Sequence, residues 1–84
     1  MRVEFFGITR ERSGVAELSV QAGTLGELLG TLAAKYPSLA ELMIDNRLHP
    51  ALAANLNGDR FVRDPRTPLA DHDCLLLLSA DAGG

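Results

Sequence analysis

The sequence has little cysteine, little positive charge and no long apolar run. Its one cysteine, Cys74, cannot form an internal disulfide, so nothing ties the chain to an oxidising compartment. The net charge of −3 argues against nucleic-acid binding, which depends on Lys and Arg neutralising phosphates. The longest apolar run, Cys74–Leu78, is far shorter than the ~20 residues that cross a bilayer. We therefore expect no nucleic acid and no membrane among the partners.

Other absences limit the chemistry that the chain can perform alone. The first residues, Met1-Arg2-Val3-Glu4, alternate like a strand and do not form a secretory signal, so we expect a cytoplasmic protein. No glycine-rich loop is followed by Lys and Ser or Thr, so an ATP site would belong to a partner. His49 and His72 lack the spacing of metal ligands. We expect the chain to bind no metal and no cofactor of its own.

What is present is the composition of one folded domain. With 84 residues, the chain can build a single modest core. Its 46% hydrophobic and 23% charged residues are ordinary for a folded protein and exclude a disordered one.

Two segments near the start alternate with the period of a half-buried strand. In residues 2–6, Val3 and Phe5 share one face, and Phe6 is an apolar residue on the otherwise polar face. Residues 15–20 alternate again. The polar residues 9–14 between them predict a short loop, so the two strands are expected to form a hairpin.

A helix beginning after Thr24 is the clearest element of the sequence. Thr24 and Glu27 form a capping-box pattern, in which each side chain can accept a free backbone N–H. Pro37 ends the helix, and the pattern gives no reason for Gly26 and Gly30. One apolar stripe follows the helical spacing: Leu25, Leu28, Leu29, Leu32, Ala33 and Tyr36.

The rest of the chain completes an α+β pattern. A second capping-box pattern, Ser38 to Glu41, predicts one or two helical turns. Residues 52–56, then 61–62 after the Asn57-Gly58 turn, and finally residues 74–78 predict strands. The last strand is apolar at every position, so it is expected to be central in the sheet or to meet something on one face. The expected fold is a two-layer α+β domain, with a helix laid across a mixed sheet.

The chain ends in small residues, with Gly83-Gly84 last. Glycine is costly to order, so such a tail does not serve stability; a backbone without Cβ atoms can instead thread a narrow channel and deliver its carboxylate to a reagent. A frayed terminus is the alternative interpretation. We expect a domain over residues 1–79 and a flexible tail over residues 80–84.

The whole sequence resembles the MoaD/ThiS family of ubiquitin-like sulfur carriers, and most closely its molybdopterin synthase small subunits. The resemblance covers the chain from end to end and implies a ubiquitin-like β-grasp fold. It is carried by an ordered series of segments: Val3-Glu4-Phe5-Phe6-Gly7, Arg10-Glu11, Gly14, the capped helix from Thr24 with Leu28 and Leu32, Pro37, Ala54-Asn55-Leu56-Asn57, Pro68-Leu69, Asp71-His72-Asp73 and Gly83-Gly84.

The resemblance implies chemistry at the carboxylate of Gly84. A ubiquitin-activating-like enzyme would adenylate it with ATP, and sulfur transfer would convert it to a thiocarboxylate. The sulfur would then be donated to the large subunit of molybdopterin synthase, or to another sulfur-accepting synthase. The chain would be a substrate or a subunit and not a catalyst alone. Phe6, Phe61, Leu78 and Ala82, with Gly83, match the positions through which the family docks its partners; Phe61 and Leu78 as core residues are the alternative.

One departure keeps other pathways open. Molybdopterin subunits usually carry a hydrophobic, proline-containing stretch before the glycines, whereas this chain has Ser79-Ala80-Asp81-Ala82. Carriers for thiamin or cysteine synthesis, a ubiquitin-like protein modifier and a plain interaction module remain alternatives. Cys74 is expected to be a small core residue and not a sulfur relay. Asp71 and Asp73 are expected to hydrogen-bond locally in a turn.

Overall fold

The computed structural model describes residues 1–83. Among these residues, no helix is long and apolar enough to cross a membrane. In chain order the elements are β1 (Arg2–Phe5), α1 (Ile8–Ser13), β2 (Glu17–Ser19), α2 (Leu25–Lys35), the 3₁₀ helices η1 (Pro37–Leu42) and η2 (Ile44–Asn46), β3 (Leu52–Leu56), β4 (Arg60–Val62), β5 (Cys74–Ser79) and α3 (Ala80–Gly83).

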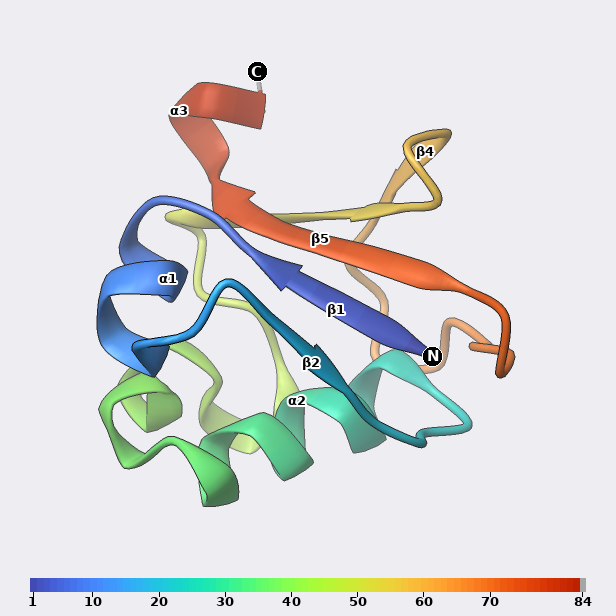
Figure 1. Cartoon of the computed structure of the whole chain (residues 1–84), viewed down its shortest axis with the longest axis horizontal. Coiled ribbons are helices and arrows are strands. Elements are labelled where there is room, and N and C mark those ends of the chain that lie inside the picture. Colours follow the sequence, from blue (N-terminus) through green and yellow to red (C-terminus); the bar gives the residue numbers. More distant parts are fainter. Residues whose placement is uncertain (84) are drawn as a thin grey trace.

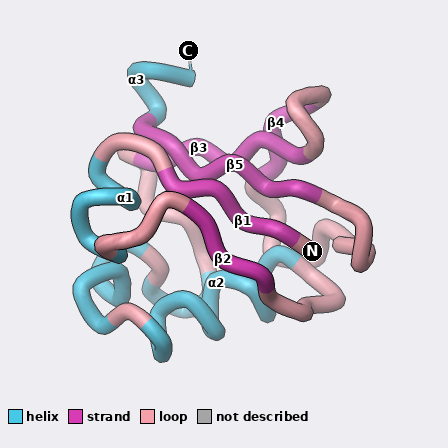
Figure 2. The backbone as a smooth tube through the Cα atoms, in the orientation of Figure 1, coloured by secondary structure: helices cyan, strands magenta, loops and turns pink. Residues whose placement is uncertain are grey.

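The strands form one mixed sheet in the order β2-β1-β5-β3-β4 (Figure 1). β1 and β5 run parallel, and the other neighbouring pairs are antiparallel. β5 is therefore central, which confirms the expectation from its uniformly apolar sequence. Figure 2 shows α2 packed across one side of this sheet, as a ubiquitin-like β-grasp requires.

α2 forms where the sequence predicts it, because its cap and its apolar stripe agree. The Thr24 hydroxyl accepts the Glu27 N–H at 3.2 Å, and the Glu27 carboxylate accepts the Gly23 N–H at 2.6 Å. The four leucines of the stripe are fully buried against the inner face of the sheet. Burying each one stabilises the fold by about 1.5–3 kcal/mol. The four buried leucines are Leu25, Leu28, Leu29 and Leu32.

The polar residues between the first two strands form a helix and not the predicted loop. β1 and β2 do pair antiparallel, but α1 connects them. Thr9 is buried in this helix, and Gly14 ends it with a left-handed φ of 78°. A helix of only six residues is too short to display an apolar stripe, so the period could not reveal it.

The second capping box also behaves differently from its pattern. Residues 37–42 are helical, as expected, but in 3₁₀ geometry and without a side-chain cap. Pro37 takes the first position, so Ser38 already lies inside the helix. Glu41 instead pairs with Arg12 of α1.

The two unexplained glycines of α2 are places of close approach. A Cβ on Gly26 would lie 3.1 Å from the Pro65 Cβ and 3.2 Å from its carbonyl oxygen. A Cβ on Gly30 would lie 2.8 Å from the Asn46 side-chain oxygen. Gly26 lets α2 pack against the loop at Pro65, and Gly30 lets it pack against η2.

Candidate functional site

The sheet face opposite α2, here called the outer face, is divided between apolar and charged side chains. Along β1, β3 and β5 the buried residues alternate with half-buried or exposed ones, which point to the outer face. Phe6 and Phe61 are the most exposed aromatic side chains there, at 43% and 56%. We define the outer apolar patch as Phe6, Ala53, Phe61, Leu76 and Leu78.

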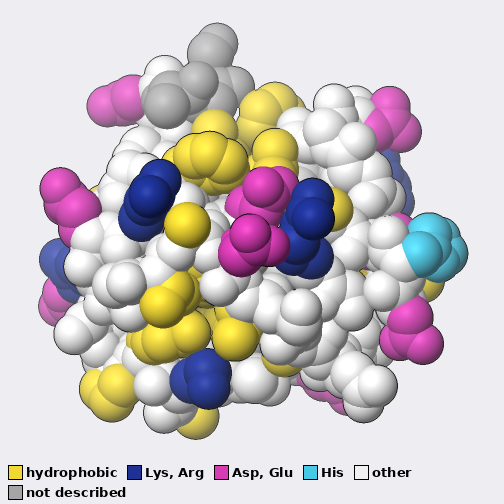
Figure 3. Space-filling model, in the orientation of Figure 1, with side chains coloured by type: hydrophobic (Ala, Val, Ile, Leu, Met, Phe, Trp, Pro, Cys, Tyr) yellow, Lys and Arg dark blue, Asp and Glu magenta, His cyan; other side chains and the backbone are white. Residues whose placement is uncertain are grey.

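Strand register brings these five residues together from four segments. Leu78 on β5 pairs with Ala53 on β3. Asn55 on β3 pairs with both Leu76 on β5 and Phe61 on β4. Phe6 follows Phe5, the partner of Leu77, so it lies beside Leu78. Figure 3 shows hydrophobic side chains gathered at the top of the view.

The residues that sequence analysis assigned to partner docking fall into two groups. Phe6, Phe61 and Leu78 share the outer face, and Leu78 is half-buried and not part of the core. The side chain of Ala82 and the whole of Gly84 lie outside the described residues, while Gly83 is the last residue of α3. Their roles in docking and chemistry stay predictions.

Two patch residues were missed at the sequence level. Leu76 points to the same face as Leu78, and the period of two along β5 could have identified it. Ala53 could not be identified that way, because its membership depends on pairing with a strand 25 positions later in the chain.

One polar side chain sits within the patch. The Oδ1 atom of Asn55 is buried and has no hydrogen-bond partner among the described residues. A buried carbonyl oxygen left unpaired costs about 1–3 kcal/mol. The patch is therefore not optimised for the stability of the isolated domain.

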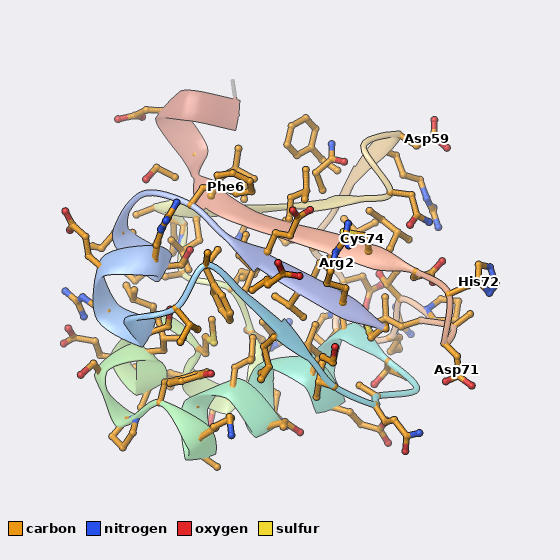
Figure 4. The ribbon with its side chains drawn as sticks, in the orientation of Figure 1. Arg2, Phe6, Asp59, Asp71, His72 and Cys74 are labelled. Atoms are coloured by element: carbon orange, nitrogen blue, oxygen red, sulfur yellow. The ribbon has the colours of Figure 1, made fainter. Side chains whose placement is uncertain are left out.

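The chain leaves the sheet beside the patch. β5 ends at Ser79, and Ala80–Gly83 form a single helical turn, α3. The Ala80 N–H donates to the Ala51 carbonyl at 2.8 Å, and the Phe6 N–H donates to the Leu77 carbonyl at 2.9 Å. We call residues 77–80 the tail root. Phe6 lies at the α3 end of the sheet in Figure 4.

The end of the outer face away from the tail carries charge, and Glu4 of this charged group borders the outer apolar patch because it pairs with Leu76. The Arg2 guanidinium lies 3.8 Å from carboxylate oxygens of both Glu4 and Glu17. Cys74 is not the core residue that the sequence predicted: it is half-buried on the outer face, and its thiol donates to the Glu4 carboxylate at 3.2 Å. Partial burial and this neighbouring carboxylate raise the pKa of the Cys74 thiol, so little of it is thiolate at neutral pH. Arg2 and Cys74 lie together in Figure 4.

Next to this charged end, Asp71, His72 and Asp73 form a turn. Asp73 accepts the Asn57 side-chain N–H at 3.0 Å and the Ala70 backbone N–H at 2.8 Å, which lowers the pKa of its carboxyl group. This is the local role that the sequence predicts for Asp73. An open hollow lined by Arg2, His72 and Cys74, among others, lies here, at the end of the sheet away from the tail.

Candidate metal ligands do not gather in the part of the chain that the structure covers. Between residues 1 and 83, no group of three or more His, Cys, Asp or Glu is placed to hold a metal ion. His49 uses its Nδ1 atom to accept the Ala51 N–H at 2.9 Å. The feature that stands out is instead an apolar patch adjoining the tail root.

Solved structures with the same fold are found across archaea and bacteria. SAMP1 from Haloferax volcanii superposes with a TM-score of 0.79 at 23% identity, covering 99% of this chain and 97% of that one. Mycobacterium tuberculosis CysO gives 0.78 at 29% identity, covering 94% and 97%. Subunits 1 and 2 of the molybdopterin-converting factor of Helicobacter pylori were solved as a complex, in which the matching chain gives 0.67 at 30% identity, covering 99% and 96%.

One of two sequence comparisons agrees with these structures. Comparison with curated protein sequences found no match. A sequence model of the ThiS family, in contrast, matches residues 3–84, which is nearly the whole chain. With the β-grasp fold and its ubiquitin-like neighbours, this match shows that the chain belongs to the ThiS family of ubiquitin-like sulfur carriers and modifiers.

Proposed function

We propose that this protein carries sulfur as a thiocarboxylate on Gly84 and presents it to partner proteins that dock on the outer apolar patch. The observation that carries the proposal is the adjacency of patch and tail. Phe6 and Leu78 flank the point where the chain leaves the sheet, so a partner bound there lies next to the tail root. Membership of the ThiS family supports the chemistry.

The proposed chemistry needs two steps at one carboxylate. Attack of the Gly84 carboxylate oxygen on the α-phosphorus of ATP forms an acyl-adenylate and releases pyrophosphate. The terminal sulfur of a donor persulfide then attacks the carbonyl carbon and AMP leaves, which gives an acyl disulfide. A thiol of the donor system attacks the donor's own sulfur in that disulfide, so the thiocarboxylate leaves and the donor and the thiol remain joined as a disulfide. The activating partner binds the ATP, and this chain supplies the carboxyl group and the docking surface.

Docking must offset the entropy of ordering the tail. Fixing the five residues 80–84 in a partner's channel costs about 1–2 kcal/mol per residue. Two exposed aromatic side chains and three half-buried aliphatic ones can contribute through burial, at about 25 cal/mol per Å². The exposed patch can thus supply binding energy that offsets the cost of ordering the tail in a partner's channel.

An exchange assay tests the first step. The activating enzyme of the same organism, mixed with this chain, ATP and labelled pyrophosphate, should move label into ATP. A variant lacking Gly84 should give none. Equal exchange with and without Gly84 would contradict the proposed site of adenylation.

For the receiving pathway, we propose molybdopterin synthesis, with this chain as the small subunit of molybdopterin synthase. The 30% identity to a subunit of the Helicobacter pylori molybdopterin-converting factor supports this choice. Deleting the gene should abolish molybdenum-enzyme activity and leave growth without thiamin and without cysteine intact. A requirement for thiamin or cysteine would assign the sulfur to that product instead. Gly84-linked adducts on lysines, found by peptide mass spectrometry, would indicate a modifier.

A further inference from the structure

The turn between β1 and α1 contacts both the outer apolar patch and the tail root. It begins at Phe6, a patch residue, passes through Gly7 and reaches Thr9 in the first turn of α1. Thr9 is fully buried, and it is the one polar side chain in the core among the described residues. A buried hydroxyl is retained in a small core only where it is hydrogen-bonded, so its partners indicate its role.

Those partners join the two ends of the sequence. The Thr9 hydroxyl lies 2.8 Å from the Phe6 carbonyl and 3.0 Å from the Leu77 carbonyl, and it can donate to either. It also accepts the Phe6 N–H at 3.2 Å. Leu77 is 68 positions away in sequence and is the first residue of the tail root. The Thr9 side chain therefore reinforces the direct hydrogen bond from the Phe6 N–H to the Leu77 carbonyl, and with it ties the patch residue Phe6 to the strand from which the tail leaves.

A second contact restrains the same place. Gly7 has a φ of 57°, and a Cβ built on it would lie 3.0 Å from the Ser79 hydroxyl. The backbone of the turn thus passes against the last residue of β5 with no space for a side chain. On the other side, the Ala51 carbonyl accepts the Ala80 N–H. The tail root is held between two loops, and the β1–α1 turn is one of them.

From this geometry we infer that Thr9 is a positioning residue for reaction at Gly84. Its hydroxyl, supported by the close fit of Gly7 on Ser79, fixes the direction in which the tail leaves relative to the docked patch. The inference rests on the proposed function and adds a residue that is buried and cannot contact a partner. Docking depends on side chains of the outer face, whereas delivery of Gly84 depends on the direction in which the chain leaves the sheet at the tail root.

Because docking and delivery depend on different residues, we expect a change at the tail root to affect the maximal rate and the half-saturating concentration differently. If the tail root loosens, the outer apolar patch still binds the activating enzyme. A smaller fraction of the bound molecules then holds the Gly84 carboxylate in position to attack the α-phosphorus of ATP. Misplacement by about 1 Å can cost on the order of 100-fold in rate. A change of this kind lowers the maximal rate and leaves the half-saturating concentration unchanged.

The test compares Thr9→Val with Thr24→Val in the exchange assay. Both substitutions remove one hydroxyl that hydrogen-bonds the backbone, but Thr24 caps α2 and contributes nothing to the tail root. We expect Thr9→Val to lower the maximal exchange rate about tenfold, with a half-saturating concentration within about twofold of the original. Thr24→Val, although also destabilised in thermal melts, should retain the original rate. Thr9→Ser keeps the hydroxyl and should retain the rate too.

The outcomes separate this inference from the proposed function. No exchange with the unaltered chain means that the proposed function is wrong. Normal exchange by the unaltered chain and by Thr9→Val, or equal losses in Thr9→Val and Thr24→Val, overturns the positioning role alone.

If Thr9→Val does not fold, Gly7→Ala provides a second probe. It should lower the maximal rate for two reasons: alanine is strained at the left-handed φ of 57°, and its Cβ would lie 3.0 Å from the Ser79 hydroxyl. Adding Ser79→Ala relieves only the contact and should recover part of the rate. A double variant no faster than Gly7→Ala would overturn the positioning role of this contact.

Discussion

The two ends of the outer face differ in how completely their side chains are satisfied. At the charged end, Arg2 lies between Glu4 and Glu17, and the Cys74 thiol donates to Glu4. Towards the tail, Phe6 is exposed beside Leu78; Phe61 is exposed on the edge strand β4 and pairs with Asn55, whose Oδ1 atom has no partner in residues 1–83. The charged end is complete within the domain, whereas the tail end keeps unfavourable surface that a partner could cover.

This difference explains where we expect function in residues 1–83, among which no group of His, Cys, Asp or Glu is placed to hold a metal ion. Exposed ion pairs contribute only about 0–1 kcal/mol, so the charged end neither stabilises the domain much nor attracts an apolar partner. Contiguous exposed apolar side chains, in contrast, mark interaction sites. The open hollow at the charged end is therefore a weaker candidate than the flat patch beside the tail.

The largest expected effect distinguishes the two faces of one strand. Leu77 is fully buried and its neighbour Leu78 is half-buried on the outer face. Leu77→Ala should lower the free energy of unfolding by about 2–5 kcal/mol because it leaves a cavity. Leu78→Ala should cost less than about 1.5 kcal/mol. Urea denaturation measures the free energy of unfolding of both variants. Equal decreases would mean that Leu78 is a core residue like Leu77.

The next prediction compares how the apolar patch and the charged end of the outer face contribute to the affinity for the activating enzyme. Phe6→Ala and Phe61→Ala should each weaken association with the activating enzyme about 30-fold, equivalent to about 2 kcal/mol for an aromatic anchor. Glu17→Ala, at the charged end, is the matched control and should change the affinity less than about twofold. Titration calorimetry measures the three constants. A larger loss for Glu17→Ala would place docking at the other end of the sheet.

A smaller effect concerns pH and the turn at the charged end. Hydrogen bonds from Asn57 and Ala70 lower the pKa of Asp73 in the folded state. Its stabilising contribution is therefore present above the unfolded pKa, about 4, and is lost as pH falls through the lower folded value. The melting temperature of Asp73→Asn should lie below that of the unaltered chain near pH 7. The difference in melting temperature between the two proteins should narrow below about pH 4. A difference that widens in acid would mean that folding raises the pKa of Asp73 and does not lower it.

The smallest effect is on the thiol. With its pKa raised, Cys74 should react with iodoacetamide at pH 8 more slowly than free cysteine does. Glu4→Gln removes the neighbouring negative charge and should increase the rate. Reaction faster than that of free cysteine would show an activated thiol and revive Cys74 as a sulfur relay.

The sequence predicted the elements whose evidence is local. The Thr24 cap and the leucine stripe lie within one helix, and the apolar run from Cys74 lies within one strand, so both could be identified from neighbouring residues. The exposure of Phe6 also followed from alternation along β1.

What the sequence could not predict depends on pairing between distant segments. Ala53 joins the patch only through its register with Leu78, and Thr9 meets Leu77 from 68 positions away. Gly26 is required by Pro65, which follows α2 by thirty positions. α1 was missed because its polar residues, Arg10 to Arg12, carry no apolar period.

The most direct test of the proposed function is the intact mass of the protein, purified from a host that has its activating enzyme and a sulfur source. A sulfur carrier predicts a species heavier by one sulfur-for-oxygen exchange, present in Cys74→Ser and absent when Gly84 is deleted. An unchanged mass, even with activating enzyme, ATP and sulfur donor in excess, would contradict the carrier function and leave a docking domain with an inert tail.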